Sequence, residues 1–133
     1  MKQRFSFLLI GICLAISSAI RADVTFRVNV PTGTTHCYVV GALPELSSWA
    51  AGAGVAMNKV EGKDQFTVTV AGITTADIST SDGYKYICGP DWKYVEVTAS
   101  NGEVSNRKTV GNPDVVARWR NTYCPVGIVE NWT

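Results

Sequence analysis

The sequence predicts an all-β protein, specifically an antiparallel two-sheet β-sandwich of the immunoglobulin-like kind with seven or eight strands. Three observations predict it. Apolar residues recur with a period of two, short apolar runs are separated by clusters of Gly, Pro, Asn, Asp and Ser, and no stretch carries a sustained helical stripe. The 133 residues suffice for one domain. With 12 Lys+Arg against 11 Asp+Glu, the near-neutral charge argues against nucleic acid as a partner.

Residues 1–22 have the composition of a secretory signal peptide. Lys2 and Arg4 precede an apolar stretch from Phe5 to Ile16, and small residues then lead to Ala22. This apolar stretch is shorter than the roughly 20 residues that cross a bilayer as a helix. We therefore expect cleavage after Ala22, a mature chain with no transmembrane segment, and a protein that is secreted, periplasmic or at the cell surface; a retained membrane anchor is the alternative.

The mature chain divides into a β-sandwich domain over residues 23–122 and a tail over residues 123–133. The segment from Val24 to Val30 alternates apolar and polar residues, which predicts a strand with one buried face. Long loops are expected at Pro44–Gly54 and Gly72–Gly83, the second with a turn of helix within Asp77–Ser81. Further strands are predicted at Cys37–Gly41, Phe66–Val70, Tyr84–Cys88, Lys93–Val97, Lys108–Val110 and Val115–Trp119.

Export would permit disulfide bonds, and the mature chain has three cysteines, Cys37, Cys88 and Cys124. An odd number allows one disulfide among them, in any of three pairings, and leaves one thiol over. These scattered cysteines and the single His36 lack the paired spacing of a zinc site. We expect no metal and no cofactor.

Catalytic motifs are scarce in this sequence. One histidine and no G-x-S-x-G motif give little support to a nucleophilic triad, so we expect no catalytic residues and no enzyme. A glycosidase needs only two carboxylates about 5 to 10 Å apart, and Glu45, Asp91, Glu96 or Glu103 could converge. Among 11 acidic residues some pair will meet by chance. A small glycoside hydrolase therefore remains only a weak alternative.

Aromatic residues point to binding, because four Trp and five Tyr are many for a small near-neutral domain. Trp49 lies in a long loop and Trp92 follows Gly89-Pro90-Asp91 at a predicted hairpin tip. Both positions suggest exposed rings that could stack on the C–H faces of sugars, although rings that cover the edge of the core are the alternative. Trp119, in the final predicted strand, is expected in the core.

Three segments together resemble the starch-binding modules of carbohydrate-binding module family 20. They are Val24-Thr25-Phe26-Arg27-Val28, then Cys37-Tyr38-Val39-Val40-Gly41-Ala42-Leu43-Pro44-Glu45-Leu46-Ser47-Ser48-Trp49, and Tyr84-Lys85-Tyr86-Ile87. The family has a V-T-F strand, a Y-V-V-G-x-x-x-E-L-G-x-W signature and a Y-K-[FY]-[IV] strand. The resemblance extends over about residues 23–120 and implies a non-catalytic β-sandwich that binds α-1,4-glucan.

The resemblance also implies which residues bind sugar. Trp49 and Lys85 fall at positions of the family's surface glucan site, whereas Val97 falls where the family has a second Trp, and four extra residues precede Asn106. A neighbouring ring, Trp92 or Tyr94, would then replace that Trp. The family's other site uses Tyr residues in loops that here are residues 32–36 and 59–63; neither loop has a Tyr, and we expect that site to be absent. The candidate carbohydrate-binding residues are therefore Trp49, Lys85, Trp92, Tyr94, Glu96 and Asn106.

Two functions follow as hypotheses. The first is a non-catalytic module that stacks aromatic rings on the glucose units of starch, glycogen or a maltooligosaccharide, alone or beside a glucan-degrading enzyme system. The second is a β-sandwich that has lost sugar binding and acts as a structural or protein-interaction domain at the cell envelope. Trp49, Lys85 and Trp92 favour the first, whereas Val97 and the loops without Tyr favour the second.

Overall fold

A computed structural model of the chain describes residues 22–121 and consists mostly of strands, in one four-stranded, one three-stranded and one two-stranded sheet. The two larger sheets lie on either side of the main hydrophobic core, to which both contribute buried side chains. The predicted all-β sandwich is therefore confirmed. Residues 1–21 and 122–133 lie outside the described residues; they include the expected leader, residues 1–22, apart from Ala22, and the whole expected tail, residues 123–133.

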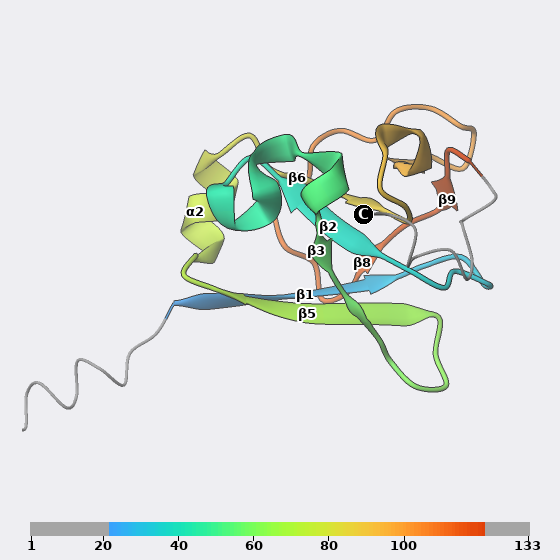
Figure 1. Cartoon of the computed structure of the whole chain (residues 1–133), viewed down its shortest axis with the longest axis horizontal. Helices are drawn as coiled ribbons and strands as arrows, with labels where there is room; N and C mark the ends of the chain where they lie inside the picture. Colours follow the sequence, from blue (N-terminus) through green and yellow to red (C-terminus); the bar gives the residue numbers. More distant parts are fainter. Residues whose placement is uncertain (1–21, 122–133) are drawn as a thin grey trace, which may run out of the picture.

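The four-stranded sheet has the order β4-β5-β1-β8. Its centre is the antiparallel pair of β1 (Asp23–Asn29) and β5 (Gln65–Ala71), which lie side by side along the lower layer in Figure 1. The alternation predicted for β1 is confirmed, because Val24, Phe26, Val28 and Val30 are all buried. The edge strands are β4 (Asn58–Lys59), which is antiparallel to β5, and β8 (Asp114–Val115), which is parallel to β1. The sequence predicted antiparallel sheets, so the parallel pairing of β1 and β8 is a difference from the prediction.

The three-stranded sheet has the order β3-β2-β6 and forms the opposite layer (Figure 1). Its central strand β2 (Tyr38–Gly41) pairs antiparallel with β3 (Val55–Ala56) and with β6 (Tyr84–Ile87). A small sheet of β7 (Glu96–Val97) and β9 (Arg118–Trp119) continues beyond β6, since the backbones of Ile87 and Val95 form an antiparallel bridge. The short strands β3 and β4 were not predicted, because two-residue strands leave no periodicity in a sequence.

Three predicted strands differ from the structure. In Lys93–Val97 only Val95 and β7 are extended, because Lys93 and Tyr94 belong to the 3-10 helix η3 (Trp92–Tyr94). Val115–Trp119 is divided between β8 and β9, and Val115, expected to face inward, is 60% exposed. Lys108–Val110 is not a strand.

Helical segments occupy the two predicted long loops. The 3-10 helices η1 (Pro44–Trp49) and η2 (Ala51–Ala53) follow β2, and the α-helix α2 (Thr75–Thr80) follows β5. A capping box begins α2: the Thr74 hydroxyl accepts from the Asp77 N–H at 3.0 Å, and the Asp77 carboxylate accepts from the Thr74 N–H at 2.9 Å. The expected helical turn is therefore present and begins two residues earlier than predicted.

A buried polar network holds the two layers together. The Tyr84 and Tyr86 hydroxyls donate to the same Asp114 Oδ2, at 2.7 and 2.8 Å. The Arg107 guanidinium donates to both oxygens of Glu96, at 2.6 and 2.9 Å, and its Cζ lies 5.5 Å from the centre of the Tyr86 ring. Burial, together with the nearby Asp114 carboxylate, raises the pKa of both tyrosines. This network anchors β6 to β8 and so fixes the strand that underlies the candidate site.

Candidate functional site

The candidate site lies on the outer face of the three-stranded sheet. Side chains alternate along β6, so Tyr84 and Tyr86 belong to the main core between the sheets while Lys85 and Ile87 lie on the opposite face. Lys85 lies directly across from Val40 in the β2–β6 register. The outer face is apolar at its centre, because Val40, Ile87 and Val95 form a second buried hydrophobic cluster.

Two tryptophans, Trp49 and Trp92, cover this cluster. Both are partly buried and pack against it, with their ring centroids 6.1 Å apart and their planes at 49°. Tyr38 of β2 packs against the same cluster and is also partly buried. We call Trp49, Trp92 and Tyr38 the tryptophan surface. Each tryptophan therefore rests on apolar side chains and still keeps part of its ring in solvent, which is the arrangement of a stacking platform.

The backbone before Trp49 is unusual. Ser47, Ser48 and Trp49 have φ values of 71°, 50° and 66°, so three successive residues other than glycine lie in the left-handed region. Each costs roughly 1–2 kcal/mol relative to a right-handed conformation. The turn persists because the Leu46 side chain is fully buried and the N–H groups of Leu46 and Ser48 both donate to the carbonyl of Leu43. Such strain is found preferentially at functional sites.

Trp92 is placed by a different device, the start of η3. The Asp91 carboxylate accepts a hydrogen bond from the Lys93 N–H at 3.1 Å and so caps the 3-10 turn that carries Trp92. The neighbouring Tyr94 does not join the tryptophan surface. Its ring packs against the main core and over Gly89, where an added Cβ would lie 2.7 Å from Tyr94 Cγ. Of the two rings expected to replace the missing family Trp, the structure brings Trp92 to the site and Tyr94 elsewhere.

Lys85 lies on the expected face, but its side chain is only 10% exposed. Its Nζ lies 3.3 Å from Oε2 of Glu103, whose side chain is 77% exposed. Sequence reasoning considered Glu103 only as one half of a catalytic pair and missed this ion pair. Signals that could have found it are weak, because a pairing across 18 residues leaves no local pattern.

Glu96 was expected to bind sugar, and the structure contradicts this because the residue is buried. Its side chain is 1% exposed, and its oxygens accept hydrogen bonds from Arg107 and from the Tyr86 N–H at 3.0 Å. It is part of the buried network instead of the surface. Val97, which falls where the family has its second Trp, is buried in β7.

Asn106 is exposed at the edge of the same sheet. It precedes Arg107, whose N–H and C=O both pair with the backbone of Tyr84 at 2.9 Å. Of the six expected residues, Trp49, Trp92 and Lys85 therefore share one face, Asn106 is exposed next to Arg107, and Glu96 and Tyr94 serve the interior.

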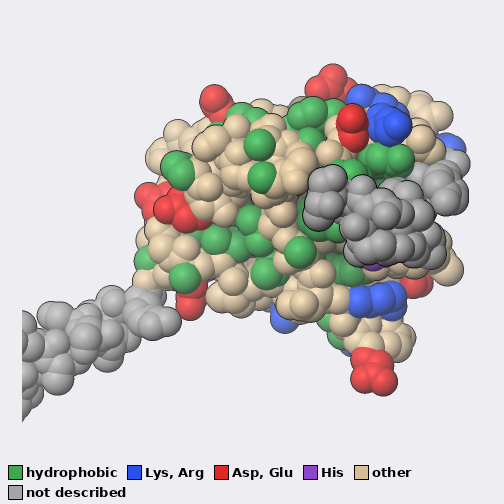
Figure 2. Space-filling model, viewed as in Figure 1, with side chains coloured by type: hydrophobic (Ala, Val, Ile, Leu, Met, Phe, Trp, Pro, Cys, Tyr) green, Lys and Arg blue, Asp and Glu red, His purple; other side chains and the backbone are tan. Residues whose placement is uncertain are grey.

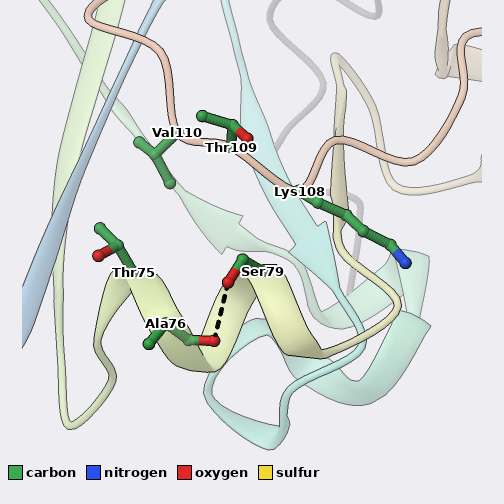
Figure 3. A pocket seen from close by; sticks show the side chains of 6 residues that line it. All are labelled: Thr75, Ala76, Ser79, Lys108, Thr109 and Val110. Atoms are coloured by element: carbon green, nitrogen blue, oxygen red, sulfur yellow. Dashed lines mark hydrogen bonds between the residues drawn. The ribbon is translucent and has the colours of Figure 1, made fainter.

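In the described part of the chain, two hollows are lined by neither Trp49 nor Trp92. One, of about 280 Å³, lies between α2 and residues 108–110 and is lined by Thr75, Ala76, Ser79, Lys108, Thr109 and Val110, with Ser79 donating to the Ala76 carbonyl (Figure 3). The other, of about 200 Å³, lies between residues 35–38 and residues 56–59, and His36, Lys59 and Tyr38 of the tryptophan surface contribute to its lining. The first has no aromatic ring in its lining and so offers no stacking platform.

One face of the molecule carries charges of both signs. On the face shown in Figure 2, the described acidic and basic side chains are dispersed among polar and hydrophobic ones, and neither sign gathers into a large patch. Within residues 22–121, no group of three His, Cys, Asp or Glu side chains could hold a metal ion. None of the helices in that range has the length and hydrophobicity of a membrane span.

The cysteines have different states. Cys37 is a free, fully buried thiol whose pKa is raised by burial, which makes it unreactive. Cys88, at the end of β6, takes part in a disulfide. Cys124 lies outside the described residues, so the pairing expected among the three mature cysteines stays a prediction.

Comparisons with known proteins bear on the fold of the chain. No protein-family model matches the sequence, and no curated protein matches it. Among solved structures, the chain is similar to the glucoamylase of Hormoconis resinae, at 15% identity and a TM-score of 0.43, over 80% of this chain and 18% of that one. The chain thus spans less than a fifth of that glucoamylase. A likeness at this level does not say what the chain binds.

Proposed function

We propose that this protein is a non-catalytic carbohydrate-binding module for α-1,4-glucan, that is for starch, glycogen or maltooligosaccharides. The observation that carries the proposal is the tryptophan pair, Trp49 and Trp92, held side by side on an apolar base, with Trp49 at the last position of the signature that resembles starch-binding modules. Aromatic rings that are half exposed and rigidly supported stack well on the apolar faces of sugar rings.

The angle between the two rings indicates the shape of the ligand. Planes tilted by 49° cannot both lie flat against a straight, ribbon-like chain such as cellulose. A helically curved α-1,4-glucan turns successive glucose faces with respect to one another, so neighbouring units could each meet one ring. The tilt therefore favours a curved glucan over a flat one.

The expected affinity is modest. Each stacked ring contributes on the order of 0.5 to 1.5 kcal/mol beyond burial of area, so a two-ring platform binds in roughly the micromolar to millimolar range. Hydrogen bonds from groups such as Asn106 would orient the sugar more than they add affinity, because each replaces a bond to water. Weak binding of this kind suits an insoluble polymer, where many sites are bound together.

The leader-like residues 1–22 support export, and an exported glucan-binding module suits a place beside a glucan-degrading enzyme system. A non-catalytic role is also consistent with the carboxylates considered above for hydrolysis. Glu96 is bound to Arg107, Asp91 caps η3, and Glu103 pairs with Lys85.

Sedimentation with insoluble starch tests this function. We expect the wild-type protein to be depleted from the supernatant by starch and to remain there with cellulose. Trp92→Ala should stay in solution with starch as well, because the platform loses one of its two rings. Val115→Ala is the matched control, since Val115 is 60% exposed on β8 in the other sheet and should leave depletion unchanged.

The alternative, a sandwich that has lost sugar binding, has one observation in its favour. Val97 is buried in β7 in place of an exposed ring, so the second ring must come from Trp92 on another segment. A wild-type protein that remains in solution with starch and cellulose alike would contradict the glucan proposal and favour a structural or protein-interaction role.

A further inference from the structure

The Lys85–Glu103 pair lies next to the tryptophan surface. Lys85 is directly across from Val40, and Ile87 lies one step further along the same face of β6; both Val40 and Ile87 belong to the cluster on which Trp49 and Trp92 rest. A ligand stacked on the tryptophans would therefore extend over this pair.

The two members of the pair differ sharply in exposure. The Lys85 side chain is 10% exposed and that of Glu103 is 77% exposed. A ligand arriving from solvent meets the carboxylate first, and the ammonium lies beneath it. Oε2 of Glu103 faces Lys85 Nζ at 3.3 Å, and among the described residues Oε1 has no hydrogen-bond partner.

A short, ordered turn fixes the backbone of Glu103. The backbones of Val97 and Glu103 form an antiparallel bridge, and residues 98–102 form the turn between them. The Gly102 N–H donates to Thr98 Oγ1 at 2.8 Å. The Thr98 N–H in turn donates to the Gly102 carbonyl at 2.9 Å, and Asn101 adopts the left-handed conformation that closes the turn. Glu103 is thus presented by a built turn and held from below by Lys85, so little conformational freedom would be lost on binding.

We propose that Glu103 is a ligand-contacting, specificity-determining residue of this site and that Lys85 is its positioning residue. The inference rests on the proposed glucan-binding function and refines it. A carboxylate with one oxygen held and the other open accepts hydrogen bonds from sugar hydroxyls, and charged acceptors form stronger bonds than neutral ones. The same carboxylate repels anionic polysaccharides, so the site selects neutral glucans.

Titration calorimetry with maltoheptaose, on the full protein, tests the inference through two substitutions at one position. We expect Glu103→Gln and Glu103→Ala each to weaken binding about tenfold, which corresponds to loss of one hydrogen bond to a charged group. Glu61→Gln, which removes a carboxylate from an exposed loop on another part of the molecule, is the matched control and should bind like the wild type. Thermal unfolding should not change in Glu61→Gln, whereas both Glu103 variants should lose some thermal stability and remain folded at the titration temperature, because the Lys85 side chain is only 10% exposed and loses its partner.

The outcomes separate this inference from the glucan proposal. Wild-type binding that Glu103→Gln and Glu103→Ala leave equal or stronger would overturn the role of Glu103 and leave the glucan function intact. Absence of binding by the wild type would overturn both. A neutral maltooligosaccharide and a carboxylated one that bind equally well to the wild type would also overturn the predicted selection for neutral glucans.

Discussion

At the scale of single residues, Ser47 shows how the site is built at a cost in stability. It stands where the starch-binding signature has Gly, and its φ is 71°. Glycine adopts this conformation freely, whereas serine is disfavoured by contact between its Cβ and the backbone. The Ser47 hydroxyl offsets part of that cost by donating to the Ala50 carbonyl at 3.0 Å.

Ser47→Gly should therefore stabilise the protein. We expect the free energy of unfolding to rise by about 0.5–1 kcal/mol. Relief of the left-handed strain raises it, whereas loss of the Ser47 hydrogen bond and the greater entropy of the unfolded chain each offset part of that gain. Urea unfolding measures it. Ser79→Gly is the matched control, since Ser79 lies within α2, and it should lower stability by a similar amount. A loss of stability with Ser47→Gly would show that the left-handed conformation is not strained.

Glu96 is the residue at which sequence reasoning failed most clearly. The alternation of residues around Glu96 does not indicate that its carboxylate accepts hydrogen bonds from Arg107, which lies 11 residues further along the chain. Trp119 shows the opposite case. Its position in the final strand predicted a core residue, and it is 4% exposed with its Nε1–H donating to Thr34 Oγ1 at 2.9 Å.

Glu96→Gln should lower the free energy of unfolding by about 3 kcal/mol, because it leaves the Arg107 guanidinium partly buried with a neutral partner. Chemical denaturation of the purified protein measures the loss. The exposed Glu61→Gln serves as control and should change stability by less than about 0.5 kcal/mol. Equal stability of the two variants would mean that the Arg107–Glu96 pair does not support the fold.

At the scale of elements, the strands with clear alternation were predictable and the short ones were not. β1, β2, β5 and β6 appear where the sequence predicts them, because each has a buried face and flanking turn residues. η3 and the break between β8 and β9 depend on local capping and on tertiary contacts, which periodicity does not contain. The site inherits this division: the strand β6 that carries Lys85 was predicted, whereas its partner Glu103 lies in a turn that has no pattern in the sequence.

The approach of η1 to β2 depends on Gly41, the glycine of the starch-binding-like signature. An added Cβ there would lie 2.7 Å from the Gly83 carbonyl oxygen and 2.8 Å from Leu46 Cδ1. Both are closer than real Cβ contacts allow, and one of them is backbone.

Gly41→Ala should therefore destabilise the protein by at least about 2 kcal/mol and weaken glucan binding by displacing Leu46 and the turn that carries Trp49. Thermal unfolding and starch sedimentation on the same samples measure both effects. Gly52→Ala is the control: its added Cβ would meet only the Pro90 carbonyl oxygen at 3.8 Å, so neither quantity should change. Equal stability and binding of Gly41→Ala and Gly52→Ala would contradict the tight packing of η1 on β2 at Gly41.

At the scale of the whole molecule, the buried tyrosines link folding to alkaline pH. Tyr84 and Tyr86 are fully buried around Asp114, and burial raises the pKa of both. Below about pH 10 the tyrosines are neutral in both the folded and the unfolded state, so their contribution to stability is fully present. Above that pH the unfolded chain loses these protons first, and stability falls.

We expect the free energy of unfolding to fall above about pH 10, by about 1.4 kcal/mol per pH unit for each of the two tyrosines. Urea unfolding between pH 8 and pH 11 measures the slope. Spectrophotometric titration of the folded protein provides the control, since Tyr84 and Tyr86 should not ionise until it unfolds. A flat stability profile together with early ionisation of every tyrosine would contradict the buried network.

The central claim is that the tryptophan surface binds a curved α-1,4-glucan. Isothermal titration of the protein with maltoheptaose, with cellohexaose as the flat control and with Trp49→Ala as the variant, tests it most directly. We expect saturable heat with maltoheptaose alone, with a dissociation constant in roughly the micromolar to millimolar range, and loss of that heat in Trp49→Ala while the circular dichroism spectrum is preserved. No heat with either sugar, equal heat with both, or full binding by a folded Trp49→Ala would contradict it.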